Sequence, residues 1–322
     1  MSRALIAGVD FGGTNLKIGL VTPEGRVVAT DVLPSKQVAS PKGFVEAVAA
    51  SVSRLARAEG VAPSQLRGVG VGAPGPVDAQ RGIVRSTVNV RGWRDVPLAG
   101  LLSRKLKCRC VVENDAKVFT LGEWRFGAGR GAQHLIGMTL GTGIGGGLIL
   151  GGALYRGSVG AAGEIGHMVI DPDGPRCGCG TRGCLEAHAG TRHILRLGHA
   201  AMRRSEDLRR RVRQAGGRLT PRIIGQAGRK GDAASRDVWR EVGRWLGIGI
   251  GNLVNLFNPE CVVIGGGVAN NWSLFSPVMQ RTVREQAMDV PRRAVKIVRG
   301  RLGNHAGIVG AAVLVWSRHE TA

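Results

Sequence analysis

The sequence predicts an α/β protein whose two halves repeat one arrangement of strands and helices. Each half opens with short apolar segments joined by glycine turns, a pattern typical of an antiparallel meander, at residues 3–33 and 134–155. In each half a stretch with apolar residues at helical spacing then leads into another apolar strand, at 43–71 and 238–264. Alternating helices and strands imply sheets with crossover helices. We therefore expect two related α/β domains that face a cleft.

The 322 residues, of which 43% are hydrophobic, are enough for two packed lobes. Because no low-complexity linker separates the halves, we place the boundary near the helix that follows Asp115. The predicted domains are a small lobe at 1–117 and a large lobe at 118–304. The apolar, helix-compatible segment 305–317 is expected to return to the small lobe.

The formal net charge of +22 is typical of proteins that bind nucleic acid or anionic surfaces. Here many arginines are scattered through helix-like stretches between Arg192 and Arg244 rather than forming one motif with interleaved aromatic residues. We interpret them as a solvated basic face, with polyphosphate or an acidic partner as the alternative.

The sequence predicts neither a signal peptide nor a membrane-spanning helix. The chain reaches Asp10 after too few apolar residues for a signal peptide. The uncharged stretch 135–155 is rich in glycine, so it is read as glycine-linked strands. We expect a cytoplasmic protein with neither nucleic acid nor membrane as a partner.

Two glycine turns are candidate phosphate sites. The first, Asp10-Phe-Gly-Gly-Thr-Asn15, links two predicted strands, so backbone N–H groups of Gly12 and Gly13 could approach an anion while the Thr14 hydroxyl adds a donor. Asp10 at the strand end could hold Mg²⁺, directly or through water. The alternative is an ordinary hairpin turn.

The equivalent turn of the second half runs from Gly141 to Gly147, and its Gly141, Thr142 and Gly143 could hold the same phosphate chain. Its glycines also satisfy the dinucleotide fingerprint, but a strand at 148–150 is expected after it where a helix is required. The chain contains no Walker sequence. A third glycine cluster follows a strand and precedes a predicted helix, where backbone could lie against an adenosine: Gly265, Gly266 and Gly267.

A candidate acid lies in Glu113-Asn-Asp115, which ends an apolar strand and precedes a helix-like stretch at 116–126. A carboxylate at a strand end, such as Asp115, can accept the proton of an attacking hydroxyl. Alternatively, Asn114 or Asp115 caps the helix.

Three cysteines and a histidine supply a complete ligand set for a tetrahedral structural Zn²⁺: His167, Cys177, Cys179 and Cys184. A closed set leaves no open position for chemistry, so the ion is expected to brace the loop. The alternative is a set of free thiols. Glu164 and Glu186 flank the cluster and could accept hydrogen bonds from a polyol, or could support His167 from behind.

Together these motifs resemble the ROK family of bacterial sugar kinases and sugar-responsive repressors, over essentially the whole chain. The resemblance is carried by Asp10-Phe-Gly-Gly-Thr-Asn15, Gly72-Ala-Pro-Gly-Pro76, Asn89 with Gly92-Trp93, Glu113-Asn-Asp115, Gly141-Thr-Gly-Ile-Gly-Gly146, Glu164-Ile-Gly-His167 and Cys177-x-Cys-Gly-x-x-Gly-Cys-x-Glu186.

The resemblance implies two actin/hexokinase-like (ribonuclease H-like) lobes that close on ATP and a sugar, in a homodimer. Asp115 would be the general base at the sugar 6-hydroxyl. The turns at 12–14 and 141–143 would hold phosphates, and 265–267 would lie beside the adenosine. The residues implied in sugar binding are Gly75, Asn89, Asn114, Asp115, Glu164, His167 and Glu186.

The expected function is ATP-dependent phosphorylation of a hexose at the 6-hydroxyl, with glucose as the first choice. N-acetylmannosamine, N-acetylglucosamine and fructose are the other substrates considered, and polyphosphate stays open as a donor. A sugar-responsive repressor is disfavoured, because repressors of this family carry an N-terminal DNA-binding domain and the first strand here is expected within a few residues of Met1.

Overall fold

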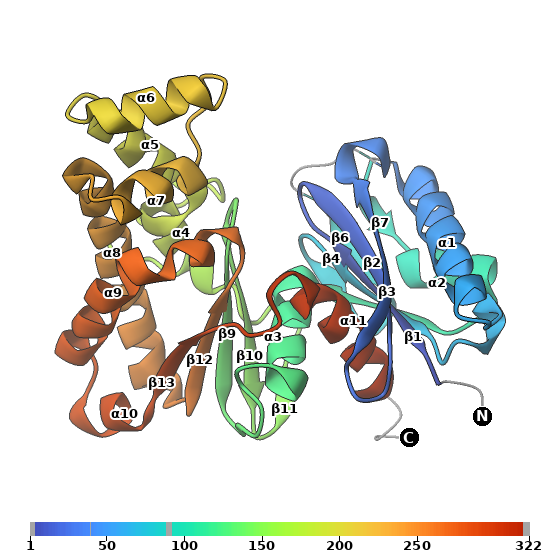
Figure 1. Ribbon diagram of the computed structural model, residues 1–322. Helices are drawn as coiled ribbons and strands as arrows, with labels where there is room; N and C mark the ends of the chain where they lie inside the picture. Colours follow the sequence, from blue (N-terminus) through green and yellow to red (C-terminus); the bar gives the residue numbers. More distant parts are fainter. Residues whose placement is uncertain (1–3, 39, 88–91, 318–322) are drawn as a thin grey trace. The chain divides into compact units, whose positions relative to one another are not determined.

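A computed structural model describes residues 4–38, 40–87 and 92–317 of the chain (Figure 1). The chain divides into two compact units, and each is discontinuous in sequence. The first unit comprises Met1–Gln133, Gly147–Gly163 and Gly300–Ala322. The second comprises His134–Gly146 and Glu164–Arg299. The chain therefore passes from one unit to the other four times.

The first sheet has five strands in the order β3-β2-β1-β4-β8. Its first three strands form the predicted antiparallel meander, and the last two run parallel to β1. The strands are β1 (Ile6–Phe11), β2 (Asn15–Val21), β3 (Val27–Pro34), β4 (Val69–Ala73) and β8 (Cys110–Asn114). A smaller sheet that the sequence did not predict contains β5 (Val77–Asp78), β6 (Ile83–Ser86) and β7 (Arg94–Val96).

Helices cover both faces of the first sheet (Figure 1). One face carries α1 and α2, and the other carries α3 and α11. Glycines at Gly8 and Gly70 allow α11 to lie directly on the strands, since a Cβ at either position would overlap the α11 backbone. The helices are α1 (Pro41–Ala58), α2 (Leu98–Leu106), α3 (Asp115–Phe126) and α11 (Ala306–Ser317).

The second sheet repeats the order of the first, as β11-β10-β9-β12-β13. Its β12 runs parallel to both β9 and β13, while β11 is antiparallel to β10. This repetition confirms the internal duplication that the sequence predicted. The strands are β9 (Leu135–Leu140), β10 (Ile144–Leu150), β11 (Ala153–Tyr155), β12 (Cys261–Gly265) and β13 (Lys296–Arg299).

Most helices of the second unit precede β12 in the chain. The long helix α8 packs against α9, and its glycines at Gly243 and Gly247 face the α9 backbone closely. The helices are α4 (Leu185–Ala189), α5 (Thr191–Met202), α6 (Glu206–Gln214), α7 (Pro221–Arg229), α8 (Ala233–Phe257), α9 (Trp272–Gln286) and α10 (Asp289–Ala294). Short 3₁₀ turns lie at η1 (Ser35–Val38), η2 (Pro63–Gln65), η3 (Ile165–His167), η4 (Gly267–Asn271) and η5 (Gly303–His305).

One predicted turn is shorter than expected. The glycine pattern predicts a turn from Gly141 to Gly147, whereas β10 already begins at Ile144. The glycines within this strand serve packing, because a Cβ at Gly147 would overlap the Thr120 side chain of α3. Stretch 135–155 is indeed a set of glycine-linked strands, and no helix among the described residues is long and apolar enough to span a membrane.

The domain boundary that the sequence suggested, after residue 117, falls inside α3 and inside the first unit. Helix α3 packs closely on α11, since a Cβ at Gly122 would lie 2.5 Å from the Ala306 carbonyl oxygen. The assignment of 118–304 to one lobe stays a prediction.

Candidate functional site

The first glycine turn connects β1 to β2, and its own backbone and Ser35 hold its shape. Gly12 N–H donates to the Asn15 carbonyl (3.1 Å), and the Ser35 hydroxyl donates to the Gly12 carbonyl (2.7 Å). Gly13 and Thr14 are exposed. The turn is thus both a hairpin turn and an open backbone surface that an anion can approach.

Asp10 is the penultimate residue of β1 and lies against the start of α11. Burial raises the pKa of its carboxyl group, and Lys17, whose Nζ is 3.6 Å from Asp10 Oδ2, opposes that rise. A Cβ at Gly307 would come within 2.5 Å of the Asp10 side chain. Gly307 is therefore a site-supporting residue that the sequence analysis missed, because its glycine lies in an ordinary apolar helix pattern.

The second glycine turn is held by residues that follow the cysteine cluster in the chain. Ile144 N–H donates to Glu186 Oε2 (2.8 Å), and the Thr191 hydroxyl donates to the Gly141 carbonyl (2.5 Å). A Cβ at Gly143 would overlap the Glu186 carboxylate. Thr142 is exposed at the tip. Thr191 was not singled out from the sequence, because its contact spans fifty positions along the chain.

The third glycine cluster lies at the end of β12, before η4. Gly266 has φ 88°, and a Cβ there would overlap the Leu140 backbone at the end of β9. A Cβ at Gly267 would have no neighbouring atom within 4 Å. Only glycine fits at 266, and it leaves a bare backbone surface at the strand ends.

The structure brings Gly75, Asn114 and Asp115 together at the junction of β8 and α3. Asn114 is the N-cap of α3, since its Oδ1 accepts from Ala116 N–H (3.0 Å). Its Nδ2 donates to the Gly75 carbonyl (3.2 Å). The capping role weighed for Asn114 is therefore confirmed. Half-buried Asp115 is the first residue of the helix. Asn89 lies outside the described residues.

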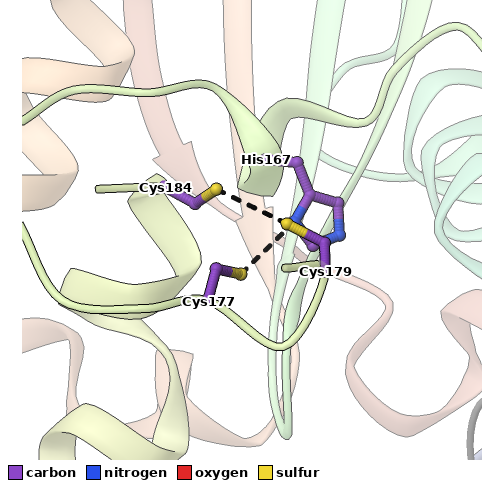
Figure 2. Close-up of side chains that lie close together, drawn as sticks. All are labelled: His167, Cys177, Cys179 and Cys184. Carbon is purple, nitrogen blue, oxygen red and sulfur yellow. Dashed lines mark hydrogen bonds between the residues drawn. The ribbon is translucent and has the colours of Figure 1, made fainter. Parts of the chain in front are cut away.

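The cysteine cluster has the geometry of a metal site (Figure 2). Its four ligand atoms, from His167, Cys177, Cys179 and Cys184, lie within 4.8 Å of one another. Cys179 Sγ is 3.7 Å from Cys184 Sγ, and Cys177 Sγ is 3.6 Å from His167 Nδ1. Tetrahedral zinc, with bonds of about 2.3 Å to sulfur and about 2.0 Å to nitrogen, separates its ligands by about 3.8 and about 3.5 Å. The donor set therefore fits Zn²⁺.

The three thiols of this cluster differ in how readily they ionise. Burial raises the pKa of Cys177, and burial followed by hydrogen bonding to the other thiols raises the pKa of Cys184 to about 12. A backbone hydrogen bond at Thr181 lowers the pKa of exposed Cys179 to about 7. Two of the three thiols thus become thiolates at neutral pH only when a cation compensates the charge.

We call residues 167–184 the metal loop. Its buried residues are glycines and cysteines alone: Gly174, Cys177, Gly183 and Cys184. Gly183 has φ 69°, and a Cβ there would overlap the Asp171 carbonyl. Cys177 N–H donates to the Thr181 carbonyl (2.8 Å), which closes the turn that carries Cys179. The glycines let the thiols converge, but the loop contains no buried apolar side chain of its own besides cysteine.

The acidic residues on either side of the metal loop differ in their surroundings. Glu186, in α4, has Oε1 3.7 Å from Cys177 Sγ, while its Oε2 accepts from Ile144 N–H. Its carboxylate therefore lies beside Cys177, one of the candidate metal ligands. Glu164 is exposed, directly before the η3 turn that carries His167. His167 presents Nδ1 to the cluster, which leaves Nε2 as its second hydrogen-bonding atom.

Two sheets of one strand order, with glycine turns after the first strand of each, define an actin/hexokinase-like α/β protein. The chain belongs to the ROK family, whose family model matches residues 6–318. A glucokinase from Streptomyces coelicolor is 36% identical over 317 residues, covering 96% of this chain and 97% of that protein.

A ROK glucokinase from Streptomyces griseus, solved in complex with glucose and AMPPNP, is 36% identical with a TM-score of 0.84. The alignment covers 97% of this chain and 99% of that one. A xylose repressor from Caldicellulosiruptor bescii is 29% identical and aligns over 97% of this chain but 78% of its own length. The chain is thus more similar to these kinases than to this repressor.

Proposed function

We propose that this chain is an ATP-dependent kinase that phosphorylates glucose at the 6-hydroxyl. The observation that carries the proposal is full-length similarity to a glucokinase solved with glucose and an ATP analogue. Similarity to the Streptomyces coelicolor glucokinase supports it. The carboxylate required for the chemistry, Asp115, is present at the start of α3.

Asp115 acts as the general base. The sugar O6 attacks the γ-phosphorus of ATP, the bond from that phosphorus to the bridging oxygen of ADP breaks, and the O6 proton passes to an Asp115 carboxylate oxygen. Because Asn114 caps α3 and is bonded to Gly75, the backbone around Asp115 is fixed before substrate arrives. Preorganisation of this kind is the main contribution that a protein makes to phosphoryl transfer.

The glycine turns hold the nucleotide. Backbone N–H groups around Gly13 and Thr14, and around Thr142 and Gly143, bind the phosphates, while Gly265–Gly267 lies beside the adenosine. Asp10 would hold Mg²⁺, directly or through water, and the ion would neutralise charge on the phosphates. The raised pKa of Asp10 is consistent with a carboxylate that is desolvated and gains from a cation nearby.

The sugar is bound by Gly75, Asn89, Asn114, Glu164, His167 and Glu186. Zn²⁺ held by the metal loop has a closed ligand set, so it supplies order to the loop and no reaction chemistry. With Nδ1 directed to the metal, His167 is fixed in the tautomer that leaves Nε2 for a sugar hydroxyl. Glu186 has one carboxylate oxygen bound to Ile144 N–H and keeps further acceptor capacity for sugar.

The test is a coupled kinase assay over glucose, mannose, fructose, N-acetylmannosamine and N-acetylglucosamine, each with ATP and with polyphosphate as donor. We expect the highest kcat/KM for glucose with ATP. A higher value for an N-acetyl hexose or for fructose would assign the chain to the corresponding kinase. Absence of turnover with every pair, in metal-loaded protein that still binds sugar, would contradict the kinase proposal.

The resemblance to the family also supports a cytoplasmic homodimer. Sedimentation velocity of the purified chain is expected to give twice the mass of one chain, 33.8 kDa. A single species at the monomer mass would contradict the dimer.

A further inference from the structure

Residues 156–163, which we call the anchored segment, are bound on both sides of Asp115: to Glu113 at the end of β8 and to Lys117 in α3. Arg156 Nε donates to Glu113 Oε2 (2.7 Å), two residues before Asp115. Lys117 Nζ donates to the Gly160 carbonyl, two residues after Asp115. Glu113 is 1% exposed and Lys117 is 3% exposed. Two buried charged side chains that the proposed chemistry does not use therefore meet one short segment.

The anchored segment has nothing apolar to hold it. It reads Arg-Gly-Ser-Val-Gly-Ala-Ala-Gly, none of its residues is buried, and Val159 is 82% exposed. Gly157, Gly160 and Gly163 all have positive φ, between 70° and 91°. Such a glycine-rich backbone loses much conformational entropy on ordering. The contacts with Glu113 and Lys117, together with a hydrogen bond from Ala162 N–H to the Arg156 carbonyl (3.0 Å), offset part of that loss.

The ion pair between Glu113 and Arg156 indicates a positioning role more than a stabilising one. Glu113 is buried, whereas the Arg156 side chain is 34% exposed. A pair of this kind is weak grounds for stability, because apolar side chains of the same volume commonly do as well or better. What the pair adds is a defined geometry: Glu113 Oε1 also accepts from Asn114 N–H (3.0 Å), so the carboxylate that holds Arg156 also holds the N-cap of α3. The segment and the backbone that carries Asp115 are thus fixed to the same carboxylate.

We propose that Glu113, Lys117 and Arg156 are positioning residues, which hold Asp115 and the segment leading into Glu164 in one fixed geometry for phosphoryl transfer. This inference rests on the proposed kinase function for its effect on turnover. The contacts themselves do not depend on that function. Gly163, the last residue of the anchored segment, directly precedes Glu164 in the chain. The position of the segment therefore restricts where the backbone of Glu164, a proposed sugar-binding residue, can lie.

The experiment compares four variants of the full chain. The double variant Glu113→Gln with Arg156→Met removes the pair without leaving a buried charge alone, and Lys117→Met removes the second tie. Arg156→Lys keeps the positive charge as the conservative replacement. Lys105→Met is the matched control, because it breaks an exposed ion pair with Glu46 in the same unit (2.8 Å).

We expect kcat to fall by roughly 10- to 100-fold in the double variant and in Lys117→Met, with KM for ATP unchanged, since small misplacements of a reacting group cost up to about this factor. Arg156→Lys should keep most of the kcat that the double variant loses. Lys105→Met should match wild type. Hydrogen exchange of a peptide spanning 153–164 should quicken in the two impaired variants and stay unchanged in the control.

A lower melting temperature with wild-type kcat and KM would assign these residues a purely structural role and overturn the proposal. So would unchanged exchange at 153–164. If wild-type protein proves inactive on every sugar, the kinase function fails, while the exchange measurement still decides whether the anchors order the segment.

Discussion

The anchored segment and the metal loop are two glycine-rich stretches ordered by different means. In the anchored segment no residue is buried, and the ties are protein charges: Glu113 with Arg156, and Lys117 with the Gly160 carbonyl. In the metal loop the ties are three thiols and an imidazole arranged as metal ligands. A loop without an apolar core depends on other contacts to offset the entropy lost on ordering, and we predict that the two anchors here can be removed separately.

The largest expected effect comes from removing the proposed general base, Asp115. Asp115→Asn keeps the side-chain volume but cannot accept the O6 proton, so kcat should fall by about 10²- to 10⁴-fold. Glucose affinity, measured by calorimetry, should stay within a few-fold of wild type. Near-normal turnover would remove Asp115 from the base role. Such a result would leave the contacts of the anchored segment without the catalytic role proposed for them.

An intermediate effect is expected from the metal loop alone. Cys179 is the exposed ligand, so Cys179→Ser perturbs packing little while removing one thiolate. We expect metal content to fall and glucose affinity to drop by roughly tenfold, or about 1.4 kcal/mol. Cys261→Ser, at a buried cysteine of β12 away from the cluster, is the control for loss of a thiol. Unchanged glucose affinity in fully metal-free protein would refute the coupling between metal and sugar.

The smallest expected effect concerns the second glycine turn, which is linked to the metal loop through Thr191 and is proposed to bind phosphate. The metal loop leads through Glu186 to Thr191, whose hydroxyl holds the Gly141 carbonyl of the second glycine turn. Thr191→Val removes that one hydrogen bond, worth about 1 kcal/mol, so KM for ATP should rise about fivefold. KM for glucose should not change. A rise in the glucose KM alone would contradict the role of this turn in phosphate binding.

The sequence predicted those features that are local in the chain. The repeated meander and crossover order was readable because each strand and turn is a short, continuous pattern, as in Ile6–Phe11 and Leu135–Leu140. The candidate metal ligands could be predicted because Cys177, Cys179 and Cys184 lie close together in the sequence. The predicted turn was wrong at its C-terminal end, because the glycines after Ile144 belong to β10. There Gly147 permits packing on Thr120.

Contacts over long separations could not be predicted in the same way. Lys117 is just one polar residue within a predicted helix, and its partner Gly160 is 43 positions away. Arg156 is equally far from Glu113, and the charge-rich composition hid it among many arginines. The support of Asp10 by Gly307 needs the C-terminal helix to be placed first. These residues became candidates only with the tertiary structure in hand.

The most direct test of the central claim, that the two stretches are held by separate anchors, is hydrogen exchange of both in one sample, before and after zinc is removed. We predict that peptides within 167–184 exchange faster after removal, while a peptide spanning 153–164 keeps its protection. Faster exchange in both, or in neither, would contradict the account.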